Sequence, residues 1–310
     1  MIARALGLAA LATLATLSLS SARAAEPGPW KQVWADEFDG DRLDPAKWSH
    51  AVDCGGGGND ERQCYVDSPD IVSVGGGLLR LKAVKRRVTG LADPWTGPSA
   101  GVKTGDYASG KILTRGKASW RYGRVEARAR VPGGQGVWPA IWMMPEDDAY
   151  GAWPRSGEID ILETVNLGAP CPGCDGGREN RIFGTIHFAA DTAGTHGQVS
   201  RSTAMPASAD GFHVYAVEWS PRAIVWSVDG RPYATASAVD WKRADGQAGA
   251  APFDRPFHLI LNLAFGGRWP EGANAGGVDE AALPAVMEVD WVRVSQRPAE
   301  PAATPSPSGR

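Results

Sequence analysis

An apolar, β-branched run that carries three carboxylates reads Ser156-Gly157-Glu158-Ile159-Asp160-Ile161-Leu162-Glu163-Thr164-Val165. Short apolar runs of this kind are typical of buried strands. An ionised carboxylate is costly to bury unless it is paired, hydrogen-bonded or used in a reaction. The segment is therefore either the catalytic strand of an enzyme or an ordinary strand with one solvated, charged face.

The spacing of the acids favours a strand. A helix turns by about 100° per residue and would point Glu158 away from Asp160 and Glu163. In a strand, Glu158 and Asp160 share one face, whereas Glu163 points to the other face unless one extra residue intervenes. A β-bulge near Ile161-Leu162 would supply that residue, so that the three carboxylates converge on one concave face.

Two carboxyl groups separated by about 5 to 5.5 Å are typical of a retaining glycoside hydrolase, in which one attacks the anomeric carbon and the other protonates the leaving oxygen. Glu158 and Glu163 have the reach for these roles. Asp160 would help to keep one of them protonated, because crowded like charges raise a pKa. We therefore expect acid and base chemistry from Glu163.

The segment from Glu158 to Glu163 resembles the signature of glycoside hydrolase family 16, in its bulged form with two residues before the last Glu. Other segments resemble the laminarinase-like members of that family, in the same order along the chain. They are Asp36-Glu37-Phe38-Asp39, Asn59-Asp60-Glu61-Arg62-Gln63-Cys64-Tyr65, Tyr122-Gly123-Arg124-Val125-Glu126-Ala127-Arg128, Val137-Trp138-Pro139-Ala140-Ile141-Trp142-Met143-Met144-Pro145, Gly184-Thr185-Ile186-His187-Phe188 and Met287-Glu288-Val289-Asp290-Trp291-Val292-Arg293-Val294.

By this resemblance, Glu158 is the nucleophile, Asp160 its electrostatic helper, and Glu163 the general acid and base of a double displacement. The bulged form is shared by laminarinases, agarases and some other polysaccharidases. The leading expectation is a retaining endo-1,3-β-glucanase that needs no catalytic cofactor. A mixed-linkage glucanase or a galactan hydrolase is the alternative within enzymes. A lectin of the same fold is a further alternative, although lectins of this kind lose the catalytic acids, which this chain retains.

The first residues resemble a secretory signal peptide at 1–24, with Arg4 before an apolar core and Ala22-Arg23-Ala24 as a cleavage site. We therefore expect a protein exported to the periplasm or the medium, with no membrane span. Without Arg4 and Arg23, 30 basic residues oppose 35 acidic ones, a net charge of −5. This balance provides no basic footprint for nucleic acid, and the expected partner is a neutral polysaccharide bound by a monomer.

One catalytic domain is expected at 25–297, followed by a disordered Pro/Ala/Ser-rich tail at 298–310. Short strand patterns dominate the domain and predict an all-β protein, an antiparallel β-sandwich of jelly-roll type with a concave carbohydrate-binding cleft. The predicted strands include 77–84, 124–131, 214–219, 223–228, 257–263 and 286–294. Asp229-Gly230 predicts a type I′ hairpin turn.

Four cysteines in an exported chain favour disulfides, although three pairings are possible. We favour Cys54 with Cys64, which would stiffen a rim of the cleft, and Cys171 with Cys174 within an inserted loop at 169–180. A zinc site built from all four cysteines is the alternative.

Aromatic and polar side chains near the acids are candidate substrate contacts. Flat indole rings suit the C–H faces of sugars, although each could equally be a core residue. The expected contacts, several of them carried by the family resemblance, are Trp138, Trp142, Trp153, Trp269, His187, Asn59, Glu61 and Arg124. Arg124 could equally be a surface charge on its strand.

A structural calcium ion is the one cofactor that the resemblance suggests. Glu37 and Asp290 would offer oxygen ligands if the first and last strands pair. Two carboxylates do not complete a calcium shell, so a pair of ordinary surface acids is the alternative.

Overall fold

The computed structural model of the protein describes residues 28–93, 97–206, 211–241 and 249–298. The signal peptide expected at 1–24 and all but the first residue of the expected tail at 298–310 lie outside these residues. Within the described part of the chain, every helix is too short or too polar to cross a bilayer.

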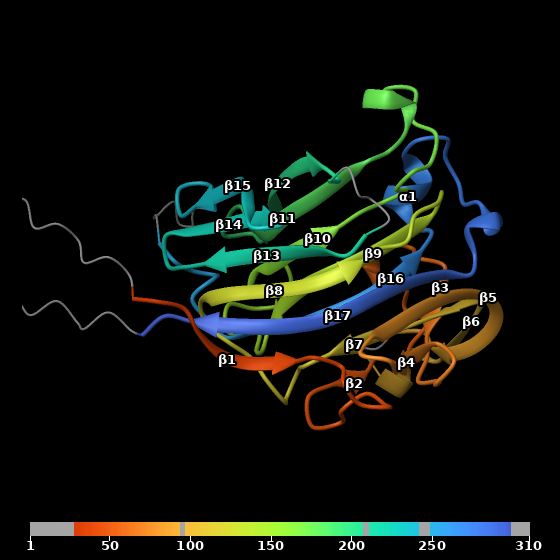
Figure 1. Ribbon diagram of the computed structural model, residues 1–310, viewed down its shortest axis with the longest axis horizontal. Coiled ribbons are helices and arrows are strands. Elements are labelled where there is room, and N and C mark those ends of the chain that lie inside the picture. The colour runs from red at the N-terminus through yellow and green to blue at the C-terminus, as the bar shows by residue number, and fades with distance from the viewer. Residues whose placement is uncertain (1–27, 94–96, 207–210, 242–248, 299–310) are drawn as a thin grey trace, which may run out of the picture.

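Two large β-sheets stack face to face (Figure 1). The outer sheet runs in spatial order through β15 (Arg231–Ser237), β14 (Ala223–Val228), β13 (His213–Trp219), β8 (Gly123–Arg130), β17 (Ala285–Gln296), β5 (Leu79–Leu91), β6 (Val102–Ser109) and β3 (Gln63–Tyr65), with β1 (Lys31–Asp36) beside β17 and β4 (Val72–Val74) beside β5.

The inner sheet carries the three-acid segment near its middle. Its order is β12 (His196–Ala204), β11 (Arg181–Ala189), β10 (Glu158–Glu163), β9 (Val137–Pro145), β16 (Phe257–Phe265), β7 (Lys111–Leu113) and β2 (Ser49–His50). Helical structure in the described residues is limited to α1 (Arg268–Gly272) and to 3-10 turns at Gly56–Gly58, Gly97–Ala100, Asp175–Gly177 and Glu280–Ala282. The all-β sandwich expected from the sequence is confirmed.

The core lies between the sheets, because each strand turns its apolar residues to that side. In β8, buried Val125, Ala127 and Ala129 alternate with more exposed charged residues. All nine residues of β16, which lies between β9 and β7, are buried. The hydrophobic effect on these paired faces therefore fixes which face of the inner sheet remains available for a site.

The strand directions agree with the prediction except at one edge. β3 runs parallel to β6, and the other pairs of named strands are antiparallel. The segment before β3 is tied by the Cys54–Cys64 disulfide, and a second disulfide joins Cys171 to Cys174. Both predicted pairings are confirmed, and the zinc alternative is wrong because all four sulfurs are in disulfides.

The predicted hairpin turn is also present. β14 ends at Val228 and β15 begins at Arg231. Asp229 and Gly230 have φ angles of 49° and 72°, the left-handed values that a type I′ turn requires at both central positions. The turn joins β15 to β14, and the side chain of Trp226 in β14 reaches β10 across the core.

Candidate active site

The strand β10 contains the predicted bulge. Against β11, Glu158 is opposite His187, Asp160 is opposite Thr185 and Glu163 is opposite Phe183, with a register shift between Asp160 and Glu163. Three residues of β10 thus span two residues of β11. Because the three partners alternate along β11, the three acids lie on one face of the inner sheet.

The opposite face of β10 is part of the core. Ile159 and Leu162 pair with Met143 and Ile141 of β9, and all four are almost fully buried. Ile161 has no partner in either neighbouring ladder and is the extra residue of the bulge. The face that carries the acids, turned away from the outer sheet, is called the catalytic face below.

A tryptophan of the outer sheet holds the bulge from beneath. The indole N–H of Trp226 donates to the backbone carbonyl of Asp160 at 2.7 Å, and Trp226 is fully buried. The bulge displaces this part of β10 from regular pairing, and a buried carbonyl needs a donor. Gly184 leaves the necessary room, since a Cβ there would lie 2.3 Å from Cδ1 of Trp226.

Each acid has an aromatic or imidazole neighbour. Trp138 donates to Glu163 at 3.0 Å, and Trp153 donates to Glu158 at 2.6 Å. Nε2 of His187 lies 3.2 Å from Oδ2 of Asp160. These indole donors orient the two glutamates without adding a positive charge.

Burial dominates the protonation of the three acids. Burial, together with the charge of Asp160, raises the pKa of Glu158 to about 8. Burial raises the pKa of Asp160 to about 7, against the effect of its hydrogen bond with Glu158. Burial and the charge of Asp160 hold the pKa of Glu163 well above its usual range. The group therefore retains protons near neutral pH and titrates as a unit, as acid and base catalysis requires.

The catalytic face continues across β9 and β16 toward the 3-10 turn at Gly56–Gly58. Trp142 lies opposite Asp160 and donates to Oδ1 of Asn262 at 2.6 Å. Asn262 donates to the hydroxyl of Tyr65 at 3.1 Å, and that hydroxyl donates to Glu61 at 3.3 Å. The sequence interpretation did not include Asn262 or Tyr65, which carry this connection.

Two further side chains complete this side. Asn59 lies 3.4 Å from Glu61, so these two expected residues are brought together. The ammonium of Lys111 lies over the rings of Tyr65 and Trp142, at 5.4 and 5.0 Å from their centroids. Lys111 escaped the sequence interpretation because its short strand carries no recognisable pattern.

Trp269 and Trp138 form an aromatic pair beside Glu163. Their ring centroids are 5.3 Å apart, and Trp269 also packs against Phe183 at 5.1 Å, both in edge-to-face geometry. The four expected tryptophans differ in exposure: Trp153 is 49% exposed, whereas Trp138 is 8% exposed. Trp153 can therefore present a ring face to a ligand, while Trp138 serves mainly as a donor to Glu163.

The inserted loop at 169–180 packs beside this aromatic pair. Glu179 is almost fully buried and accepts hydrogen bonds from Arg181 and Asn274. Asn166, just before the loop, donates to Asn274 and to the carbonyl of Pro270, the residue after Trp269. The loop is thus fastened to the segment that carries Trp269.

Arg124 does not belong to the catalytic face, which corrects one expectation. It lies on β8 of the outer sheet, where Val125 points into the core and Arg124 points outward. Its guanidinium is 2.8 Å from Glu126 and 3.9 Å from Glu218. The alternating burial of β8 places it among cross-strand ion pairs of the outer surface.

Of the two proposed calcium ligands, Glu37 directly follows β1 and Asp290 lies in β17, and an arginine binds each carboxylate. β1 pairs with β17 as expected, with Asp36 opposite Val292. Glu37 receives two hydrogen bonds from Arg293, at 2.9 and 2.8 Å, and Asp290 is paired with Arg128. As arranged here, these two carboxylates do not form the oxygen shell that calcium needs.

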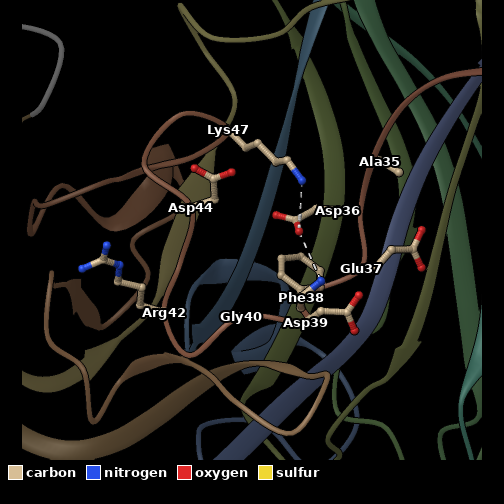
Figure 2. Close-up of a pocket in the computed structure, with 9 residues that line it drawn as sticks. All are labelled: Ala35, Asp36, Glu37, Phe38, Asp39, Gly40, Arg42, Asp44 and Lys47. Carbon is tan, nitrogen blue, oxygen red and sulfur yellow. Dashed lines mark hydrogen bonds and ion pairs between the residues drawn. The ribbon is translucent and has the colours of Figure 1, made fainter.

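Glu37 is one of the residues that line a pocket of about 320 Å³ (Figure 2), and none of the three acids lines it. Asp36, which lines it, accepts from the backbone N–H of Phe38 and from the indole of Trp48, and it also faces Lys47. The carboxylate of Asp36 therefore has partners on both oxygens, and the pocket shares no residue with the catalytic face.

Two groups of side chains in the described residues have the geometry of metal ligands. Cys171, Cys174 and Glu179 form one, but the cysteines are in a disulfide. Glu158, Asp160 and His187, whose ligating atoms lie within 4.8 Å of one another, form the second. We assign this second group to acid and base chemistry, because Glu158 and Asp160 are two of the three acids aligned by the bulge.

Comparison with known proteins agrees with this geometry. The model of glycosyl hydrolases family 16 matches residues 66–293. A β-glucanase of Rhodothermus marinus is 40% identical over 287 residues, covering 89% of this chain and 88% of the relative. A glucan endo-1,3-beta-glucosidase of Cryptopygus antarcticus is 38% identical over 247 residues, covering 78% and 83%. The X-ray structure of the laminarinase from Rhodothermus marinus superimposes with a TM-score of 0.71 at 40% identity, covering 87% of this chain and 98% of that one.

Proposed function

Because this chain belongs to glycosyl hydrolase family 16, we propose that it is a secreted, retaining endo-β-glucanase that hydrolyses 1,3-β-glucan. The observation that carries the proposal is the bulge of β10, which puts Glu158, Asp160 and Glu163 on one face. Two carboxyl groups that flank a glycosidic bond are the machinery of this reaction.

Glu158 is the nucleophile in the proposed mechanism. Its carboxylate attacks the anomeric carbon while Glu163 gives its proton to the leaving oxygen. Glu163 then takes a proton from water, which hydrolyses the glycosyl ester. The strongly raised pKa of Glu163 suits the acid role, and the indole of Trp153 stabilises the ionised form of Glu158.

Asp160 supports both glutamates. It shares a hydrogen bond with Glu158, and its charge favours the protonated form of Glu163. The three acids need not ionise independently, so a proton held by Glu158 in the free enzyme can pass to Asp160 when the nucleophile is needed.

The proposed substrate rests on the curated relatives that act on β-glucans and on the aromatic side chains of the catalytic face. Trp153, Trp142 and Trp269 supply apolar surface beside the acids, whereas Asn59 and Glu61 supply hydrogen-bonding groups. A mixed-linkage glucan or a galactan could be cleaved by the same acids, so the substrate is the property to test first.

Secretion is proposed from the N-terminal segment and the two disulfides, which persist in oxidising compartments. Catalysis by three carboxyl groups needs no cofactor. A structural calcium at Glu37 and Asp290 stays a prediction, since an ion there has to displace Arg293 and Arg128. A higher Tm in calcium chloride than in EDTA would support it, and an unchanged Tm would refute it.

The test is reducing-sugar release by the mature protein and by its Glu158→Gln variant from laminarin, lichenan, agarose and carrageenan. Product lengths are read by chromatography and the first-formed anomer by NMR. Cleavage of laminarin to several oligomers with β-anomers first, lost in the variant, supports the proposal. Activity mainly on lichenan or a galactan refutes the substrate, α-anomers refute retention, and binding without release identifies a lectin.

A further inference from the structure

A second histidine lies behind the one that faces Asp160. Nε2 of His196, the first residue of β12, is 2.7 Å from Nδ1 of His187. The strand register explains this contact, because His187 is opposite Gln198, which lies two residues from His196 on the same face. The two imidazoles and Asp160 therefore form a continuous chain from β12 to β10.

Only one arrangement of protons on the two imidazoles places an N–H of His187 toward the carboxylate of Asp160. A neutral imidazole has one N–H and one acceptor nitrogen. If His196 donates from Nε2, His187 accepts at Nδ1 and carries its own N–H on Nε2, which lies 3.2 Å from Oδ2 of Asp160, a buried oxygen that accepts no other hydrogen bond from the described residues. The reverse arrangement would place a lone pair of His187 against the carboxylate. Burial and the charge of His187 lower the pKa of His196, which favours its neutral form.

His196 also contacts the other neighbour of the nucleophile. Its ring lies 4.8 Å from the ring of Trp153, whose indole N–H donates to Glu158. Asp191 anchors the turn before His196 through two hydrogen bonds to Thr195. One side chain at the start of β12 thus contacts both groups that face Glu158 and Asp160.

We propose, building on the proposed function, that His196 is a positioning residue, which fixes the N–H of His187 toward Asp160 and supports Trp153 against the nucleophile. Neither His196 nor its contacts follow from the sequence motifs. The charged groups around the pair are Glu158, Asp160 and Glu163 of β10 and, near the turn, Arg155 and Asp191. The two imidazoles would influence the protonation of the acids of β10.

The first test determines which imidazole nitrogen of His187 carries the proton, and it does not depend on activity. Long-range ¹H–¹⁵N NMR of the imidazole nitrogens distinguishes the two tautomers of His187 in the wild-type protein and in His196→Ala. We expect the Nε2–H form in the wild type and a mixture in the variant. An Nδ1–H form in the wild type would overturn the proposal, whether or not the protein hydrolyses glucan.

The second test is the pH profile of kcat/KM on the polysaccharide that the wild type cleaves best. Loss of the N–H toward Asp160 makes the ionised acids less stable, so the acidic limb should move to higher pH in His196→Ala. We expect a shift of roughly half a unit to one unit, which is a roughly threefold to tenfold loss of kcat on that limb, with KM changed less than about twofold. His196→Gln, which retains an amide N–H, should recover most of the loss.

The matched control is Arg201→Ala on the same strand. Arg201 is opposite Gly184, on the side of β12 that faces away from the acids, and it should leave the profile unchanged. A purely structural role of His196 predicts a lower Tm with an unmoved acidic limb, and that result would refute the proposal. Absence of hydrolysis by the wild type would instead refute the proposed function and leave the NMR test valid.

Discussion

Replacing Glu158 by Gln should abolish hydrolysis and stabilise the folded protein at neutral pH. The pKa of Glu158 is raised from 4.5 to about 8 by burial and by Asp160. The unfolded side chain ionises near pH 4.5, whereas the folded one retains its proton up to about pH 8. Unfolding therefore releases a proton between these values, and the folded state loses stability as the pH rises through this window.

The size of the effect follows from the same shift. At pH 7, the solution lies about 2.5 units above the ordinary pKa and still below the folded one, and each unit corresponds to about 1.4 kcal/mol. The destabilisation at pH 7 therefore has an upper limit of about 3.5 kcal/mol. Because a buried amide also needs hydrogen-bond partners, we expect a gain of about 1 to 3 kcal/mol, or roughly 2 to 8 °C in Tm.

The assay is the Tm of the wild type and the variant at pH 4, 5.5, 7 and 8, beside reducing-sugar release. The two proteins should melt together at pH 4 and separate progressively above it. Glu218→Gln, which alters a half-exposed carboxylate of the outer sheet, is the control and should change the stability by less than about 0.5 kcal/mol. A Tm difference that is the same at pH 4 and pH 7, or a lower Tm of the variant at pH 7, would refute the reasoning.

Three further predictions address the acid, the bulge and a disulfide. Glu163→Ala should lose activity on polysaccharide but, given azide and an aryl glycoside with a good leaving group, should form the β-glycosyl azide; an α-azide would refute retention. Trp226→Phe should lose about 1 to 3 kcal/mol of stability in denaturant titrations, because the carbonyl of Asp160 loses its donor, and a neutral result would refute that role. Cys54→Ser with Cys64→Ser should lower the free energy of unfolding by roughly 2 to 3 kcal/mol, the loop-entropy value for a separation of 10 residues, and retained stability would contradict this estimate.

The geometry of the acids could be predicted from the sequence because it depends on local parity. Side chains alternate in a strand, so the odd interval between Asp160 and Glu163 requires one extra residue if both face the same side. The hairpin at Asp229-Gly230 was predictable for the same kind of reason, since few residues accept positive φ. Both features are set within a few residues.

The contacts that failed or were missed depend on pairings between distant segments. Arg124 matched a family segment, but the alternation of β8 turns it outward. β1 and β17 pair as expected, yet Arg293 binds Glu37 and Arg128 binds Asp290, and the sequence does not show either of these pairings. His196 reaches the site only through the register of β11 with β12, which no local pattern specifies.

Because of the bulge, the residues of β10, Trp226 of β14 and Gly184 of β11 depend on one another. An odd spacing of acids needs an extra residue in β10, and that residue takes the carbonyl of Asp160 out of regular pairing. The carbonyl is buried, so a donor has to come from the other sheet, and Trp226 supplies it across the core at 2.7 Å. An indole in that position leaves no room for a side chain on β11, which accounts for Gly184. Gly184 of β11 is therefore a packing consequence of the catalytic spacing, and any residue larger than glycine there should displace Trp226 and release the bulge.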